Sequence, residues 1–591
     1  MKTTTYLSTL LFFFFSPTLF TFAQTAEDSV LNRNITIERE YQPAIQDAGK
    51  INSLPHFIEP KVAKIAPEYT TNFSKPLSVE QNIHYLASAK LAQPKKKYNE
   101  GYARAALGTG FNSLADFAFP LVRKPDMKLD FILNHYGLFN SKAHSTTQAA
   151  LLFDKKFSLI DFYVSMNAQH EYFKYYGNTF NSIESLNFNN LTENFGNYTF
   201  QPTLRPEIAT DLSTLANLPK TNALWRMNIN TGVRTSPTID DLRYGIHLNY
   251  NLFNAKNGIT EQLVELNANI DTELLGNRFG ISFATNNQLY TTANSELEDI
   301  QKNYSVLFIN PYYSFEQEAF DLRLGVKSSF SFAHGRGFSP SPDIRFEWRA
   351  VPQTLAIYAG AIGNYKVNSM SEMYSENRFL NPDVSVDDTY TPAEFYFGLK
   401  VKPLAGLLVD AYFDYKIINN QYFFVNKEYK LTESNPVASY AEHNKLLYTN
   451  RFEAVYSKAN QLKIGGRISY NHHDKLSIQL NGAYKHWNAA DFEYAWNKPT
   501  WELDLNTNIR VTSKINVYGN MQLSGKRYAK IGDTAVEMKA KTDINLGAAY
   551  AVYDWLSAFL KINNLINSKY EQCYGYEMQG FNVMAGTIFS F

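Results

Sequence analysis

The stretch that decides the fold runs from Trp501 to Val511 and reads WELDLNTNIRV. Its odd-numbered residues form an apolar row interrupted only by Thr507, and its even-numbered residues, from Glu502 to Arg510, are all polar or charged. Successive side chains of a β-strand point to opposite faces. This period of two therefore predicts a strand with one apolar face and one polar face.

The same alternation recurs at 393–402 and at 242–252. Strands of soluble proteins usually have about five or six residues, whereas a tilted strand that crosses a bilayer needs about nine to eleven. The polar face suits a wet lumen and the apolar face suits lipid. Because an open sheet edge in hydrocarbon would leave backbone groups unpaired, such strands must close into a ring.

The chain has 591 residues, and the part from Gly101 to Phe591 is long enough for about 22 such strands with their connections. The sequence therefore predicts an all-β fold, a transmembrane antiparallel β-barrel with an extended N-terminal periplasmic arm. The alternative is a long soluble β protein, such as a propeller or a solenoid. Strand length is the main argument against that alternative.

The composition excludes several classes of protein. Lys and Arg number 56 against 56 Asp and Glu, which argues against a basic nucleic-acid-binding protein. Aromatic residues make up 15% of the chain, too many for a disordered protein. Cys573 is the only cysteine, so neither an intrachain disulfide nor a cysteine-based zinc site can form.

Three regions follow one another along the chain. Residues 1–23 have a lysine, an apolar run and a small-residue ending, which together indicate a secretory signal peptide. Residues 24–100 contain six of the 22 prolines and are predicted to form an extended periplasmic arm. This arm could instead fold back into the barrel lumen. Residues 101–591 are the predicted outer-membrane barrel.

The C-terminal strand has a lipid-facing row of its own. Counting back by twos from the last residue gives Phe591, Phe589, Thr587, Ala585, Val583 and Phe581. A terminal aromatic strand of this form resembles the signal by which the barrel-assembly machinery of the outer membrane recognises its clients. The simpler interpretation is an ordinary amphipathic strand.

Just upstream, a set of residues resembles the ending of TonB-dependent receptor barrels. The set comprises Asn564, Leu565, Tyr570, Gly575, Tyr576 and Gly580. Gln579 and Phe581 depart from that family, which often has Pro and Arg around this glycine. The resemblance implies the outer membrane of a Gram-negative bacterium, contact with its lipid, and energy-coupled import of a nutrient.

The arm is shorter than the folded plug of that family, so the sequence predicts a barrel without a complete plug. An empty lumen of this size would breach the membrane. The arm, the long loops or a second protein must therefore occupy it, and a lumen-filling or surface lipoprotein is a possible partner. Within the arm, Ile35, Thr36, Ile37, Glu38 and Arg39 resemble the strand that pairs edge to edge with TonB, although any short β segment would look alike.

Loop lengths predict the sidedness of the barrel. With Phe591 on the periplasmic side, the stretches 566–579, 528–537 and 488–498 are expected outside, and tight turns near Ser513 and Asp554 inside. The largest insertion, 175–221, is a further candidate to cap the outer mouth or to contact a ligand.

Chemical motifs are weak. The triplet His472, His473 and Asp474 falls in a predicted tight turn, and Asp383, Asp387 and Asp388 lack calcium-loop spacing and are expected to be solvated. Neither a cofactor nor an enzymatic activity is therefore predicted. The leading hypothesis is a TonB-dependent-receptor-like transport protein. The alternatives are a plugless barrel that serves as a scaffold or partner-binding subunit of an envelope complex, and an open porin.

Overall fold

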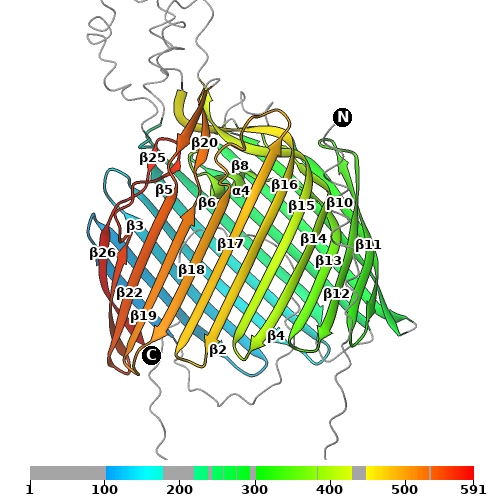
Figure 1. Cartoon of the computed structure of the whole chain (residues 1–591), viewed down its shortest axis with the longest axis horizontal. Coiled ribbons are helices and arrows are strands. Elements are labelled where there is room, and N and C mark those ends of the chain that lie inside the picture. Colours follow the sequence, from blue (N-terminus) through cyan, green and yellow to red (C-terminus); the bar gives the residue numbers. More distant parts are fainter. Residues whose placement is uncertain are drawn as a thin grey trace, which may run out of the picture. The chain divides into compact units, whose positions relative to one another are not determined.

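The fold is one sheet of 22 strands (Figure 1). The computed structural model describes residues 101–177, 219–236, 242–256, 258–274, 276–292, 301–382, 384–428, 448–531 and 534–591. The first eleven strands are β1 (Tyr102–Gly108), β2 (Asn112–Arg123), β3 (Met127–Leu138), β4 (His144–Lys156), β5 (Ile160–Lys174), β6 (Thr221–Thr235), β7 (Leu242–Ala255), β8 (Ile259–Leu274), β9 (Asn277–Thr292), β10 (Tyr304–Glu316) and β11 (Phe320–Phe332). The others are β12 (Phe338–Val351), β13 (Leu355–Lys366), β14 (Thr389–Leu404), β15 (Leu407–Glu428), β16 (Tyr448–His472), β17 (Leu476–Ala489), β18 (Trp501–Arg510), β19 (Ile515–Ser524), β22 (Lys541–Tyr553), β23 (Leu556–Asn563) and β26 (Asn582–Ser590).

The sheet closes on itself. Each strand pairs antiparallel with the next one along the chain, and β1 pairs antiparallel with β26, from Tyr102 opposite Ser590 to Gly108 opposite Met584. Closure leaves no open edge, which is the requirement that hydrocarbon imposes on a sheet. The predicted antiparallel barrel and its strand number are confirmed. The signal peptide and the arm at 24–100 lie outside the described residues.

The two faces of the wall differ as the alternation predicted. On β7, Leu242, Ile246 and Leu248 are exposed on the exterior, whereas Phe253 near the end of the strand is buried on the opposite face. On β26, the odd-numbered row ends in exposed Phe589, and the even-numbered residues Asn582, Met584 and Ile588 are buried. The exterior is therefore apolar enough to lie in lipid.

The inner face carries paired charges. Lys400 on β14 lies 3.2 Å from Glu347 on β12, and Lys463 on β16 lies 3.6 Å from Asp414 on β15. Lys485 also pairs with Glu502. These pairs place opposite charges side by side on the polar face, which lines the lumen as the alternation predicted.

The two rims differ in the length of their connections. Tight turns near Ser513 and Asp554 lie at one rim. The opposite rim, called the outer rim below, carries the long connections, including the hairpins β20 (Arg527–Ile531) with β21 (Thr534–Met538) and β24 (Glu571–Cys573) with β25 (Tyr576–Glu577). The stretches predicted to lie outside share this rim. The strand ends at Lys174 and Thr221 also match the predicted large insertion.

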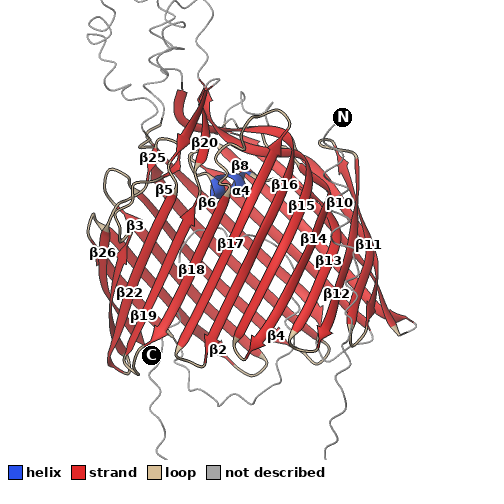
Figure 2. Ribbon diagram, in the orientation of Figure 1, coloured by secondary structure: helices blue, strands red, loops and turns tan. Residues whose placement is uncertain are grey.

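A single short helix, α4 (Met370–Glu376), stands among the described elements, in the connection between β13 and β14 (Figure 2). No helix in the described part of the chain is long and apolar enough to span a membrane.

Candidate functional site

A segment of the chain enters the barrel at the outer rim. It comprises residues 367–382 and 384–388, contains α4, and is called the mouth segment. The Ser369 side chain caps the helix by accepting a hydrogen bond from the Glu372 backbone N–H at 3.1 Å. Met370, Met373 and Tyr374 recur at helical spacing and are all buried, so α4 packs through one apolar face.

The mouth segment crosses the lumen. Its apolar residues form one buried cluster with Leu224 on β6, Phe253 on β7 and Ile259 on β8. The same cluster includes Tyr422 on β15 and Phe452 on β16. Because β6 and β16 stand ten strands apart in a ring of 22, the cluster joins nearly opposite sides of the wall.

Polar contacts fix the beginning of the segment. The Glu261 carboxylate on β8 accepts the backbone N–H groups of Met370 at 2.6 Å and Ser371 at 3.2 Å. The Gln288 side chain on β9 donates to Glu261 and to the Asn368 carbonyl oxygen, each at 3.0 Å. Glu261 is buried, so these bonds supply its main compensation for the loss of water.

A buried carboxylate fixes the end of the segment. Asp388 accepts hydrogen bonds from the hydroxyls of Tyr365 (2.6 Å) and Tyr304, and burial raises the pKa of its carboxyl. The expectation that Asp388 is solvated is therefore wrong, because tyrosines from two distant strands enclose it. Asp387 is partly exposed and lies 3.3 Å from His334, and Asp383 lies outside the described residues.

The loop at 564–581 closes over the mouth segment from the side. Tyr576 is fully buried, stacks on Phe379 with ring centroids 3.5 Å apart, and donates to the Asn450 carbonyl oxygen at 2.6 Å. Tyr570 donates to Asp543 at 3.0 Å. Tyr576 thus joins the mouth segment to β16, and Tyr570 joins the loop to β22.

The remaining family-like residues shape that loop. The Asn564 side chain accepts the Ser568 N–H at 2.8 Å and donates to the Gln579 carbonyl oxygen at 3.1 Å. Gly575 has a positive φ of 83°, which a residue with a side chain rarely adopts. A Cβ atom at Gly580 would lie 2.4 Å from the Asn567 side-chain oxygen. Leu565 is partly exposed.

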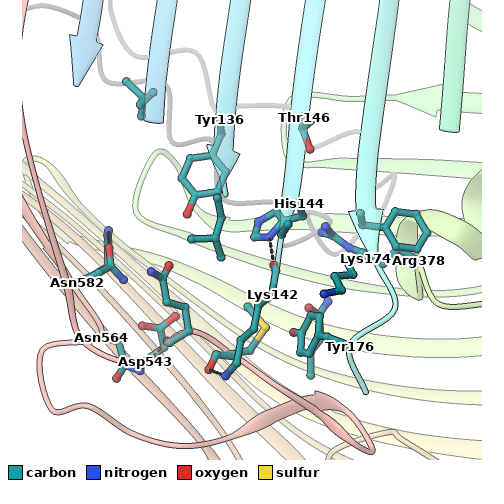
Figure 3. Close-up of a pocket in the computed structure, with 18 of the residues that line it drawn as sticks. Tyr136, Lys142, His144, Thr146, Lys174, Tyr176, Arg378, Asp543, Asn564 and Asn582 are labelled. Atoms are coloured by element: carbon teal, nitrogen blue, oxygen red, sulfur yellow. Dashed lines mark hydrogen bonds between the residues drawn. The ribbon is translucent and has the colours of Figure 1, made fainter. Parts of the chain in front are cut away.

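A cavity of about 220 Å³ lies between this loop, the mouth segment and the inner wall of the neighbouring strands (Figure 3). Figure 3 shows Asp543, Asn564 and Asn582 on one side, and Lys174, Tyr176 and Arg378 on the other. Among the described residues that line it, four are Lys or Arg (Lys142, Lys174, Arg378 and Lys561) and one is acidic (Asp543). Its aromatic residues are Tyr136, Phe173, Tyr176, Phe379 and Tyr570.

Lys142 and Arg378 each have a hydrogen-bonding or ion-pair partner in the structure. Lys142 donates to the Met578 carbonyl oxygen at 3.0 Å and lies 3.5 Å from Glu577. Arg378 lies 3.2 Å from Glu171 on β5. The site therefore combines positive charge, aromatic surface and amides near the outer rim, an arrangement suited to ligand binding.

Lys142, Lys174 and Arg378 belong to none of the motifs that the sequence shows. Their only visible signal is a position at or near the outer end of a predicted strand or loop. The TonB-like segment at Ile35–Arg39 lies outside the described residues. Within the described ranges, no group of three or more His, Cys, Asp or Glu residues is arranged to hold a metal ion.

Three further residues singled out in the sequence lie in the connections between strands. His473 and Asp474 lie in the tight turn between β16 and β17, as predicted. Cys573 lies in the outer connection, also as predicted, where it is buried against the mouth segment, and burial raises the pKa of its thiol to about 12.

Comparisons with solved structures show the same fold. A variant of the ferric enterobactin receptor PfeA from Pseudomonas aeruginosa matches with a TM-score of 0.56 and 11% identity, over 83% of this chain and 80% of that one. The siderophore receptor PirA from the same organism matches with a TM-score of 0.54 and 10% identity, over 83% and 80%. The ferripyoverdine receptor of the outer membrane of P. aeruginosa matches with a TM-score of 0.50 and 12% identity, over 83% and 72%.

No protein-family model and no curated protein sequence matches the chain. At 10 to 12% identity the structural similarity shows a shared fold. That fold is the barrel that the resemblance of the last strands implied. Together with the apolar exterior, it identifies the chain as an outer-membrane barrel.

Proposed function

We propose that this chain is an outer-membrane receptor that imports a nutrient by capturing it in the cavity at the outer mouth. The main support for this proposal is that the mouth segment crosses the lumen and forms one wall of a basic and aromatic cavity. An open porin needs an unobstructed lumen, and a pure scaffold has no need of a cavity inside its wall.

The similar structures suggest the first ligands to test. Their names identify receptors for ferric enterobactin, for ferripyoverdine and for siderophores. An iron–siderophore complex is too bulky to diffuse through a narrow pore and has polar groups that amides and cations can bind. We therefore place this ligand class first for the present chain.

Energy coupling is the second part of the proposal. Residues 34–40 include Ile35–Arg39, whose alternation suits edge-to-edge pairing with TonB. Main-chain hydrogen bonds between two strands transmit a pull with little demand on sequence. The arm or a lipoprotein partner then occupies the part of the lumen below the mouth segment.

Uptake of iron-55-labelled siderophores by cells that produce the chain tests the proposal. Uptake is expected to require an energised membrane and to stop when residues 34–40 are deleted, while deletion of the equally long stretch 68–74 leaves it intact. Uptake that survives the first deletion would refute the proposed energy coupling through TonB.

Two other experiments test the remaining parts of the proposal. Affinity isolation from outer membranes identifies a lipoprotein partner. Large constant currents in planar bilayers would indicate a porin instead of a receptor.

A further inference from the structure

Three charged side chains join the mouth segment to the wall. Glu171 on β5 lies 2.8 Å from Arg226 on β6 and 3.2 Å from Arg378 in the mouth segment. The side chains of Glu171 and Arg226 are 8% and 14% exposed, so the pair is largely removed from water. A single carboxylate thus serves two arginines, one fixed in the wall and one carried by the segment.

This arrangement makes one of the two bonds exchangeable. Breaking a buried ion pair by removing one partner is costly because the other charge is left without compensation. When Arg378 moves away, the Glu171 carboxylate is still paired with Arg226, so its charge stays compensated. The Arg378 charge stays compensated only if another anion replaces Glu171.

The cavity is where such an anion would arrive. Arg378 lines it together with Lys174, which has no acidic partner among the ion pairs of the described residues. The rings of Phe379 and Tyr176 line the same space, and Phe379 is the next residue after Arg378. Positive charge beside aromatic faces suits an anion attached to a flat apolar body.

We propose that the cavity binds a polyvalent organic anion with a planar body. This anion replaces Glu171 as the ion-pair partner of Arg378, and loss of the Arg378–Glu171 pair releases the mouth segment from the wall. The inference rests on the proposed receptor function and adds to it the ligand class and the residue that couples binding to opening. Arg378 is the coupling residue because it alone belongs to the segment and contacts both the wall carboxylate and the cavity.

The only cysteine of the chain provides a native reporter. Cys573 is buried in the cluster that packs against Phe379 and Tyr576, and a buried protonated thiol reacts slowly. When the mouth segment leaves, the thiol becomes accessible to a maleimide. Benzene-1,3,5-tricarboxylate is the probe, and its neutral triamide is the control of equal shape.

In the purified full-length protein, the tricarboxylate is expected to raise the rate of Cys573 labelling by about 5- to 150-fold, the usual range of coupling between two sites. The triamide should leave the rate unchanged. In Arg378→Gln the rate should be high without any anion and insensitive to it. Arg378→Lys keeps the charge and should keep the response, and Arg349→Gln, at the opposite rim, should behave as wild type.

Equal effects of the tricarboxylate and the triamide would overturn the proposal, and so would an Arg378→Gln protein that labels slowly and still responds. Inorganic phosphate has no planar body, so a response to phosphate as large as that to the tricarboxylate would overturn the ligand class. Failure of energy-dependent uptake with normal anion-dependent labelling would reject the receptor function and leave the binding site standing.

Discussion

Replacing Glu261 with Gln tests whether the mouth segment is held by the wall. The Glu261 carboxylate accepts two backbone N–H groups of the segment, from Met370 at 2.6 Å and Ser371 at 3.2 Å. A glutamine of the same shape has one acceptor oxygen, so it keeps one of these bonds and places an N–H group against the other.

Hydrogen bonds to a charged group contribute about 1.5 to 3 kcal/mol each. Loss of one should therefore raise the population of the released segment by about 10- to 150-fold, since about 1.4 kcal/mol corresponds to a factor of ten. Amide hydrogen exchange of the peptide at 367–382, followed by mass spectrometry in detergent or nanodiscs, measures this population because the exposed amides exchange.

Glu265→Gln is the matched control. Glu265 lies on the same strand and face, where it accepts a hydrogen bond from Asn249 at 2.6 Å. Its replacement should leave exchange in the mouth segment unchanged. Equal exchange in wild type and Glu261→Gln, with the barrel intact, would refute the assignment of Glu261 as the anchor.

Three further changes test other contacts. Tyr576→Phe keeps the ring stack and loses the bond to the Asn450 carbonyl oxygen, so exchange in the mouth segment should rise by about a factor of five, equivalent to about 1 kcal/mol; no change would mean that this bond does not hold the segment. Because burial raises the pKa of Asp388, its contribution to the stability of the packed segment is complete below the ordinary value of 3.8 and is lost as pH rises through the raised value. Asp388→Asn should therefore flatten the rise of exchange with pH, and an unaltered profile would show that Asp388 does not cause that rise. Asp414→Ala leaves Lys463 buried without its carboxylate and should lower barrel stability in urea by about 3 to 5 kcal/mol, and an unchanged midpoint would show that the wall ladder contributes little.

The barrel wall could be predicted from the sequence because the pattern that specifies each strand lies in consecutive residues. The alternation at Trp501–Val511 and at 242–252 follows from the period of the strand and from the need to separate lipid from water. Closure and strand number then follow from strand length and from the cost of an open edge. The C-terminal row lies on the exterior as predicted, whereas its role as an assembly signal stays a prediction.

The site could not be predicted because its contacts join distant strands. Asp388 belongs to a stretch that reads as a polar loop, yet Tyr304 and Tyr365 bury it. Arg378 carries no motif, and its importance depends on Glu171, about two hundred positions away in the sequence. Tyr576 was identified through a family resemblance, and its contact with Phe379 required the three-dimensional structure.

The closed ring is expected to separate lipid outside from a watery lumen, in which the proposed ligand site lies. Spin labels placed one at a time along β7, in a Cys573→Ser background, test it most directly. In a reconstituted bilayer, labels at Leu242, Ile246 and Leu248 should collide with dissolved oxygen, and a label at His247 should collide with a water-soluble relaxing agent. Equal accessibility of all four positions to water, or no alternation along the strand, would contradict the account.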